Sequence, residues 1–193
     1  IKKIFNNNGF LMEGVMLFTP KVFPDKRGVF FENWNKNNLN KFIGPKNFVQ
    51  DNISISNKNV IRGMHYQLNP SAQGKLISTI NGAIYDVIVD LRKSSKTFKT
   101  WAGVHLDSKN RSILWIPSGF AHGFLSLEDN TIVNYKVDNY WNKSLERSLK
   151  WNDRDIKIKW PNLNENIQVF SISDKDQDAK SLKEIEKEGA FFE

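Results

Sequence analysis

Residues 75–92 read KLISTINGAIYDVIVDLR, the stretch that decides the fold class of this chain. In residues 76–80, the side chains of Leu76, Ser78 and Ile80 alternate with those of Ile77 and Thr79. Such a period of two is typical of a β-strand. Asn81 and Gly82 form a dipeptide that strongly favours a two-residue turn, and a second apolar run continues from Ile84 to Val89. The stretch therefore predicts a β-hairpin.

Short runs of similar character lie on both sides of this stretch, separated by turn residues. They recur at roughly 8 to 12 residues, the spacing of strands in a sandwich or barrel. They are VIRGMHYQ (60–67), WAGVHLD (101–107), SILWIP (112–117), FLSL (124–127) and TIVNYKV (131–137). Two short helices are expected, from Lys36 to Ile43 before Gly44 and from Ser181 to Lys187 before Gly189. The sequence thus predicts a mostly β protein, a jelly-roll barrel with a few short helices.

Length and composition indicate one domain. The chain has 193 residues, 39% of them hydrophobic, so residues 1–193 are expected to share one core, with a helical tail from about residue 177. Cysteine is absent, which excludes disulfides and a cysteine nucleophile and fits a reducing compartment. Asn6 and Glu13 interrupt any apolar signal segment, and nowhere do about 18 apolar residues follow one another. A cytoplasmic protein that contacts no membrane is expected.

The positive charge of the chain favours an anionic ligand. The net charge is +7 and the isoelectric point is near 9.5. The lysines and arginines are scattered, however, and neither a zinc-finger spacing nor an RNA-recognition signature is present. A small polyphosphate ligand therefore fits this pattern better than nucleic acid does.

Asp86 lies in the strand IYDVIVD and has the same parity as Ile84 and Ile88, which places it on one face with two apolar side chains. Two interpretations stay open. In the first, this face points inward and Asp86 needs a buried partner. In the second, it faces solvent and residues 85, 87 and 89 face the core.

The segment PSGFAH, from Pro117 to His122, resembles the second metal-binding motif of cupins, a jelly-roll family. The first cupin motif is missing, because neither His65 nor His105 has a second histidine two residues away. Two isolated imidazoles are a poor cage for a transition metal, which usually has at least three protein ligands. No metal is expected, and a metal-dependent cupin enzyme is the alternative.

His65 lies in RGMHYQLNPSAQGKL (62–76), between Arg62 and Lys75. A lone strand histidine is more often structural, but these two cations suit a phosphate or an oxyanion. The chain contains no G-x-S-x-G, G-x-G-x-x-G or Walker motif, so hydrolase and nucleotide-loop chemistry are not indicated. Proton transfer is the chemistry that remains.

Seven segments in order carry a more specific resemblance: RGMHYQ, AQGKL, IYDVIVDLRKSS, LWIPSGFAHGF, NYK, LKWND and SDKD. Together they resemble the dTDP-4-dehydrorhamnose 3,5-epimerase family of cupin-fold enzymes, from about Lys21 to Asp176. The resemblance implies a cofactor-free isomerase that inverts C3 and C5 of a dTDP-4-keto-6-deoxyhexose for rhamnose and polysaccharide synthesis. Inversion at C3 alone is the nearest alternative, and a jelly-roll that only binds nucleotide sugars is a further one.

The resemblance also implies catalytic roles. His65 is the base, Tyr135 the acid on the opposite side of the sugar, and Lys75 the cation at the enolate oxygen. Asp176, in the segment SDKD, is the carboxylate that orients the histidine, with Asp174 and Asp178 as rivals because the connection at 162–170 is longer than usual. From the residues alone, Tyr135 is more typical of a half-buried packing residue and Lys75 of a surface lysine on a strand, so only the resemblance assigns them these catalytic roles.

The substrate contacts implied by the resemblance belong to a nucleotide sugar. They are Arg27, Glu32, Gln50, Asp51, Asn52, Arg62, His122, Tyr140, Glu146 and Lys175. Arg62 and Lys175 suit the diphosphate, and Tyr140 suits stacking on the base. The family also implies a homodimer with an exchanged N-terminal strand, in which Arg27 and Glu32 complete the partner's site.

Overall fold

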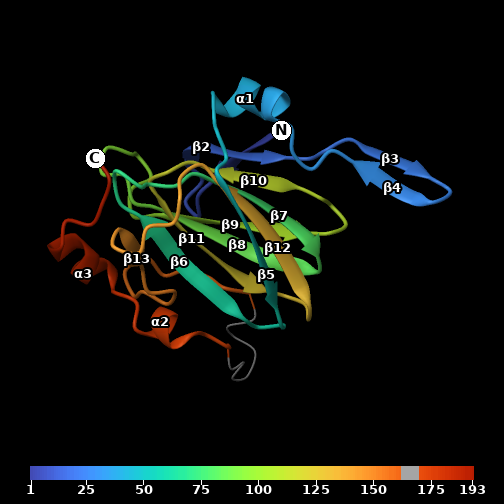
Figure 1. The fold of residues 1–193 in the computed structure, drawn as a ribbon. Helices are drawn as coiled ribbons and strands as arrows, with labels where there is room; N and C mark the ends of the chain where they lie inside the picture. Colours follow the sequence, from blue (N-terminus) through green and yellow to red (C-terminus); the bar gives the residue numbers. More distant parts are fainter. Residues whose placement is uncertain (162–169) are drawn as a thin grey trace.

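A computed structural model describes residues 1–161 and 170–193, so most of the long connection expected at 162–170 lies outside the described residues. The chain forms two antiparallel β-sheets and a two-stranded arm that projects from the body (Figure 1). The six-stranded sheet has the order β1 (Lys2–Phe5), β2 (Leu11–Phe18), β10 (Ile113–Ile116), β7 (Lys75–Asn81), β12 (Thr131–Val137) and β5 (Gln50–Ser56). The five-stranded sheet has the order β13 (Glu146–Ser148), β6 (Ile61–Gln67), β11 (Phe120–Ser126), β8 (Ala83–Asp90) and β9 (Trp101–Asp107).

The arm and three short helices complete the described fold. The arm consists of β3 (Val22–Asp25) and β4 (Gly28–Phe31). The helices are α1 (Lys36–Ile43), α2 (Asp174–Gln177) and α3 (Leu182–Lys187). The prediction of a mostly β protein with a few short helices is confirmed. No helix in the described part of the chain is long and apolar enough to cross a membrane.

The predicted hairpin at residues 75–92 is wrong, although the turn is where the sequence placed it. β7 pairs with β10 and β12, whereas β8 pairs with β11 and β9, so the turn carries the chain from one sheet to the other. Gly82 has φ +74°, and a Cβ there would lie 2.4 Å from Oγ1 of Thr131. Local turn chemistry is the same for a hairpin and for such a corner. The choice between them depends on partner strands distant in sequence.

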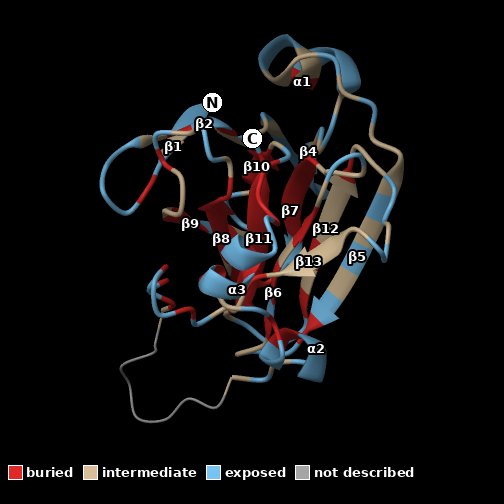
Figure 2. Cartoon of the chain, turned by 90° about the vertical axis from the view of Figure 1, so that its left-hand side faces the viewer, coloured by how far each residue is buried: buried red, intermediate tan, exposed pale blue. Residues whose placement is uncertain are grey.

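Two apolar clusters lie on the two sides of the five-stranded sheet. The first fills the space between the sheets and includes Ile77 and Leu114 from one sheet and Ile84 and Phe124 from the other. The second packs the outer face of the five-stranded sheet against the C-terminal segment and includes Trp160 and residues of α3. Burial is accordingly greatest in the central strands, while β5 at the sheet edge stays partly exposed (Figure 2).

The two interpretations of Asp86 are decided by these clusters. Ile84 and Ile88 belong to the cluster between the sheets, and Val87 and Val89 to the outer one. The inward interpretation of Asp86 is therefore confirmed, and exposure of its face to solvent is wrong. Both faces of β8 are buried, so an alternation of apolar and polar residues, which identifies a strand with one buried face, does not describe it.

The remaining predicted elements are confirmed with small shifts. The five short runs coincide with β6, β9, β10, β11 and β12, and β11 begins four residues before FLSL. α1 is capped by Asn35 and ends at Gly44, and α3 begins after Ser181 with a capping box to Glu184. β1 to β3, β5, β13 and α2 were not predicted, whereas β4 lies within the N-terminal strand segment, Arg27 to Glu32, that the resemblance implied. In β5, polar residues face the interior of the protein, so the usual pattern is inverted.

Candidate active site

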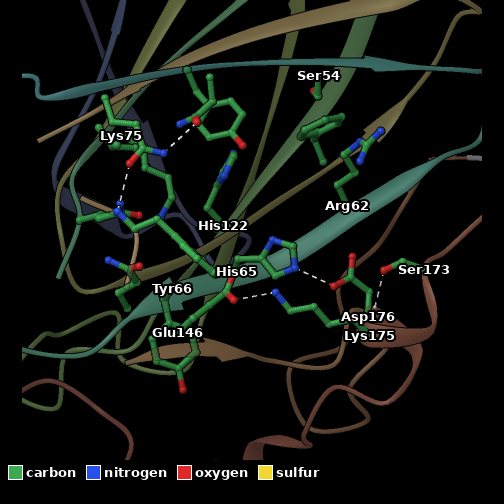
Figure 3. A pocket seen from close by; sticks show the side chains of 18 residues that line it. Ser54, Arg62, His65, Tyr66, Lys75, His122, Glu146, Ser173, Lys175 and Asp176 are labelled. Carbon is green, nitrogen blue, oxygen red and sulfur yellow. Dashed lines mark hydrogen bonds and ion pairs between the residues drawn. The ribbon is translucent and has the colours of Figure 1, made fainter. Parts of the chain in front are cut away.

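A cavity of about 390 Å³ lies between the two sheets and is lined by polar side chains from both (Figure 3). The six-stranded sheet contributes Gln50, Asn52, Ser54, Lys75, Tyr135 and Val137. The five-stranded sheet contributes Arg62, His65, Tyr66, Gln67, His122, Phe124 and Glu146. Gln73, Trp141, Ser173, Lys175 and Asp176 complete the lining.

His65 stands on β6 in the wall formed by the five-stranded sheet. Its Nε2 lies 2.6 Å from Oδ1 of Asp176, while the backbone N–H of Gly63 donates to Oδ2 at 3.2 Å. Asp176 is held in place by α2, whose first turn is capped by Ser173. Of the three candidate carboxylates, Asp176 is the one that contacts His65 (Figure 3).

The charge state of Asp176 sets the tautomer of His65. Burial raises the pKa of Asp176, but the hydrogen bond and charge of His65 and the Gly63 N–H outweigh burial, so the pKa is lowered. An ionised carboxylate only accepts, and Nε2 of His65 therefore carries the donated proton. The lone pair of a neutral His65 then resides on Nδ1, which makes that nitrogen the basic one.

Lys75 and Tyr135 stand in the opposite wall, on the neighbouring strands β7 and β12. Lys75 is buried, and burial lowers its pKa to about 8 although the charges of Asp138, Asp86 and Glu146 raise it. Burial also raises the pKa of Tyr135, which keeps the phenol protonated. This wall thus offers a cation and a proton donor to the side of the cavity opposite His65.

His122 is the second histidine of the cavity and neighbours His65 across the β6–β11 pairing. Its Nε2 lies 2.8 Å from Oδ2 of Asp86, the buried partner that the inward interpretation required. In the described part of the chain, no group of three or more His, Asp or Glu side chains could hold a metal ion. His105 lies apart on β9, where its Nδ1 is 3.4 Å from Asp107.

Charged and amide groups surround the rest of the cavity. Lys175 from α2 forms an ion pair of 2.7 Å with Glu146 on β13. Nε of Arg62 donates to Oγ of Ser56 at 3.0 Å. Two cations on separate elements can contact the two phosphates of a diphosphate.

Four predicted contacts lie away from this cavity. Arg27 is on the arm, where it pairs with Asp25, and Glu32 accepts from two side chains at the start of α1. Asp51 points to the outer face of β5 and accepts from Lys136. Tyr140 is exposed, and its neighbour Trp141 lines the cavity in its place.

Sequence reasoning also missed some lining residues. They are Ser54, Phe124, Val137, Trp141 and Ser173. The signal for Ser54 was available, because Gln50, Asn52 and Ser54 alternate along QDNISIS with two isoleucines. Trp141 lies one residue beyond Tyr140, and only the path of the chain after β12 decides which ring reaches the cavity.

Comparison with known proteins agrees with this geometry. Residues 10–184 match the family model described as dTDP-4-dehydrorhamnose 3,5-epimerase. A relative from Shigella flexneri, named dTDP-4-dehydrorhamnose 3,5-epimerase, is 49% identical over 163 residues, which are 84% of this chain and 87% of the relative.

Solved structures show the same similarity. The dTDP-4-dehydrorhamnose 3,5-epimerase of Bacillus anthracis, solved with TDP and PPi bound, superposes with a TM-score of 0.84 at 44% identity, covering 94% of this chain and 99% of that one. The Legionella pneumophila enzyme, in complex with dTDP-4-keto-L-rhamnose, has a TM-score of 0.86 at 37% identity, with coverage of 98% and 96%. The fold is thus the cupin-like barrel of these enzymes, and the chain belongs to the dTDP-4-dehydrorhamnose 3,5-epimerase family.

Proposed function

We propose that this protein inverts C3 and C5 of dTDP-4-dehydro-6-deoxyglucose to form dTDP-4-dehydrorhamnose, without a cofactor. Membership of the family supports this activity and its place in rhamnose biosynthesis. One observation carries the mechanism: the His65–Asp176 pair and Tyr135 stand in opposite walls of a single cavity. The cytoplasmic location expected from the sequence is part of the same proposal.

The reaction begins with removal of a proton next to the keto group. Nδ1 of His65 takes the proton from C3, and the electron pair of the C–H bond forms a C3–C4 double bond while the keto oxygen becomes an enolate. The charge of Lys75 stabilises this oxygen, and Asp176 stabilises the imidazolium. Tyr135 then donates its proton to C3 from the other face, and the carbonyl re-forms. His65 then releases its proton to solvent and Tyr135 takes one up from solvent, which restores both groups, and the same cycle inverts C5.

The nucleotide half of the substrate is assigned to the charged and aromatic groups of the cavity. Arg62 and Lys175 bind the diphosphate, and Gln50, Asn52 and Glu146 supply further polar contacts. His122 is assigned to the sugar half instead. Stacking on the base, expected of Tyr140, is better assigned to Trp141 because its ring lines the cavity.

A homodimer with an exchanged arm is also part of the proposal. The arm projects from the body (Figure 1). Its side chains Phe23, Val29 and Phe30 are exposed. The outer face of the six-stranded sheet exposes Ile53 and Ile55 as well. Apolar surface of this kind is typical of a face that another protein covers. In such a dimer, Arg27 and Glu32 on the arm and helix start would reach the partner's cavity.

Exchange of hydrogen for deuterium tests the activity at each carbon. The protein is incubated with dTDP-4-keto-6-deoxyglucose in D₂O, and deuterium is located by NMR. We expect incorporation at both C3 and C5. Incorporation at C3 alone would assign the protein to the C3-only epimerases. If no deuterium entered at either carbon, the proposal would be refuted and the protein would be one that only binds nucleotide sugars.

The base is tested by replacing His65 with alanine. We expect His65→Ala to lose essentially all turnover and all exchange, because the substitution removes the proposed base, while dTDP binding measured by calorimetry is retained. His105→Ala is the matched control, since His105 lies away from the cavity, and it should keep the full rate. An unchanged rate in His65→Ala would refute the mechanism.

A further inference from the structure

Asp86 is a fully buried carboxylate that the mechanism above does not use. It lies on β8 beneath the cavity lining and does not itself reach the cavity. Its Oδ2 lies 2.8 Å from Nε2 of His122, within hydrogen-bond distance, whereas its Oδ1, also buried, has no partner within the described residues. A buried carboxylate with one unsatisfied oxygen is costly, so its position needs a reason beyond packing.

The neighbours of Asp86 indicate that reason. β8, β11 and β6 are adjacent in the five-stranded sheet, and His122 on β11 lies directly opposite His65 on β6. The inner face of the sheet therefore carries two imidazole–carboxylate pairs side by side. One is His65 with Asp176, and the other is His122 with Asp86.

The negative charge of Asp86 also acts on Lys75, which faces it from the other sheet. Three carboxylates favour the charged form of Lys75: Asp138 after β12, Asp86 on β8 and Glu146 on β13. The other titratable groups that line the cavity are His65, Tyr66, His122, Tyr135, Lys175 and Asp176. Burial raises the pKa of Asp86, and the charges of His122 and Lys75 oppose that rise. The pKa of Asp86 stays above its ordinary value because burial outweighs these two neighbours, which favour the carboxylate form.

We propose that Asp86 is a positioning residue for the epimerisation: it fixes the ring of His122 through Nε2 and holds a negative charge opposite Lys75, so that both side chains are aligned on the keto oxygen. This inference rests on the proposed function. The carboxylate acts through His122 and Lys75 and touches no substrate atom. Asp86 orients His122 as Asp176 orients His65. The difference is that His122 is directed at the enolate oxygen, whereas His65 is directed at the carbon that loses the proton.

The test is the variant Asp86→Asn, which keeps the shape and an acceptor for Nε2 of His122 but removes the charge. Turnover should fall roughly 10- to 100-fold, the size expected when the partner of an active-site histidine is lost. The alkaline limb of the turnover–pH profile, which follows Lys75, should move to lower pH by about one unit because Lys75 loses an opposite charge. The affinity for dTDP should not change, since Arg62 and Lys175 are untouched.

Asp153→Asn is the matched control. Asp153 is another buried carboxylate, but it accepts from backbone N–H groups near α3, away from the cavity. It should lower thermal stability without moving the pH profile. If Asp86→Asn loses turnover only in step with stability and dTDP binding, with its alkaline limb unmoved, Asp86 is merely structural and the inference is overturned. Wild-type protein that exchanges no deuterium would instead refute the proposed function.

A measurement on the wild-type protein covers the case in which Asp86→Asn does not fold. The chain has only three histidines, so their ring nitrogens can be assigned by NMR with His105→Asn and His122→Asn as references. His122 should carry a proton on Nε2 that exchanges slowly from pH 6 to pH 9. A lone pair on Nε2 of His122 would show that Asp86 does not hold the ring, and would overturn the inference.

Discussion

At the scale of single residues, the cavity region contains buried charged groups whose burial lowers the free energy of unfolding. Lys75 is buried with a pKa lowered to about 8, and Asp86 is buried with an unsatisfied oxygen. Such groups concentrate at functional sites, where the cost of burial is retained because the chemistry needs the charge. Two predictions concern this scale.

Lys75→Met should stabilise the protein while abolishing turnover. Below pH 8 both folded and unfolded Lys75 are protonated, and the lowered pKa means that the charge destabilises the folded state. Removing it should raise the free energy of unfolding at pH 7 by about 1 to 3 kcal/mol. Between pH 8 and pH 10.5 the unfolded chain binds the extra proton, so wild-type stability rises with pH and the difference shrinks.

Urea unfolding of both proteins at pH 7 and pH 9.5 measures this effect. Lys143→Met, at an exposed lysine, should change the free energy of unfolding by less than about 0.5 kcal/mol. A Lys75→Met protein that is less stable than the wild type at pH 7 would show that the ammonium is satisfied by its surroundings.

Tyr135→Phe should separate proton removal from proton return. The base His65 remains, so deuterium should still enter at C3, but the proton would return from the face it left, and inversion should fall by about 100-fold or more. Position-resolved NMR for exchange and a chiral readout for inversion measure the two rates in one sample. If exchange and inversion fell equally, Tyr135 would not be the specific donor.

At the scale of elements, the turn between β7 and β8 determines which residues meet in the cavity. Because the chain crosses from one sheet to the other at Gly82, Lys75 lies in the six-stranded sheet and Asp86 in the five-stranded sheet. A hairpin would have put both residues in one sheet. The close contact of Gly82 with Thr131, at the start of β12, holds this corner.

Gly82→Ala should therefore destabilise the protein more than Gly9→Ala, because an added Cβ at Gly9 has free space around it. Both Gly82 and Gly9 have positive φ, +74° and +83°, so alanine is strained at either position by about 1 kcal/mol. A Cβ at Gly9 meets nothing within 4 Å, whereas at Gly82 it meets Thr131 at 2.4 Å. Urea unfolding should show an additional cost of about 1 to 3 kcal/mol for Gly82→Ala. Equal costs would mean that the corner can relax.

At the scale of the whole molecule, the arm is the feature that a single chain does not explain. It exposes apolar side chains, and it places Arg27 away from the chain's own cavity. An arm that completes a partner's site accounts for both observations. In the proposed dimer, activity would be a property of the pair rather than of one subunit.

Subunit complementation tests the exchange. His65→Ala and Arg27→Ala should each be strongly impaired as pure proteins. If the arm reaches across, a mixed dimer has one site with both residues intact, and an equal, fully re-equilibrated mixture should recover about a quarter of wild-type turnover.

The control mixture combines His65→Ala with Arg62→Ala, whose altered residues line the same subunit's cavity. No mixed dimer then holds an intact site, so turnover should not recover. Failure of the first mixture to recover turnover, with mixed dimers demonstrated by mass spectrometry, would refute the exchanged arm.

The sequence by itself determined the strand-rich class and most strand positions, because β-branched alternation and turn residues act locally. Its motifs also resemble those of a known family, and this resemblance, rather than the residue types alone, singled out His65, Lys75, Tyr135 and Asp176. α1 and α3 followed from their caps for the same local reason.

Only the tertiary structure decided which strands are neighbours, that the turn at Gly82 is a corner rather than a hairpin, and that Trp141 rather than Tyr140 lines the cavity. It also decided that Asp176 rather than Asp174 or Asp178 meets His65, and that Asp86 lies beneath His122. These outcomes depend on contacts between residues far apart in the chain, where one residue of register moves a side chain to the other face. Local sequence patterns do not specify such contacts.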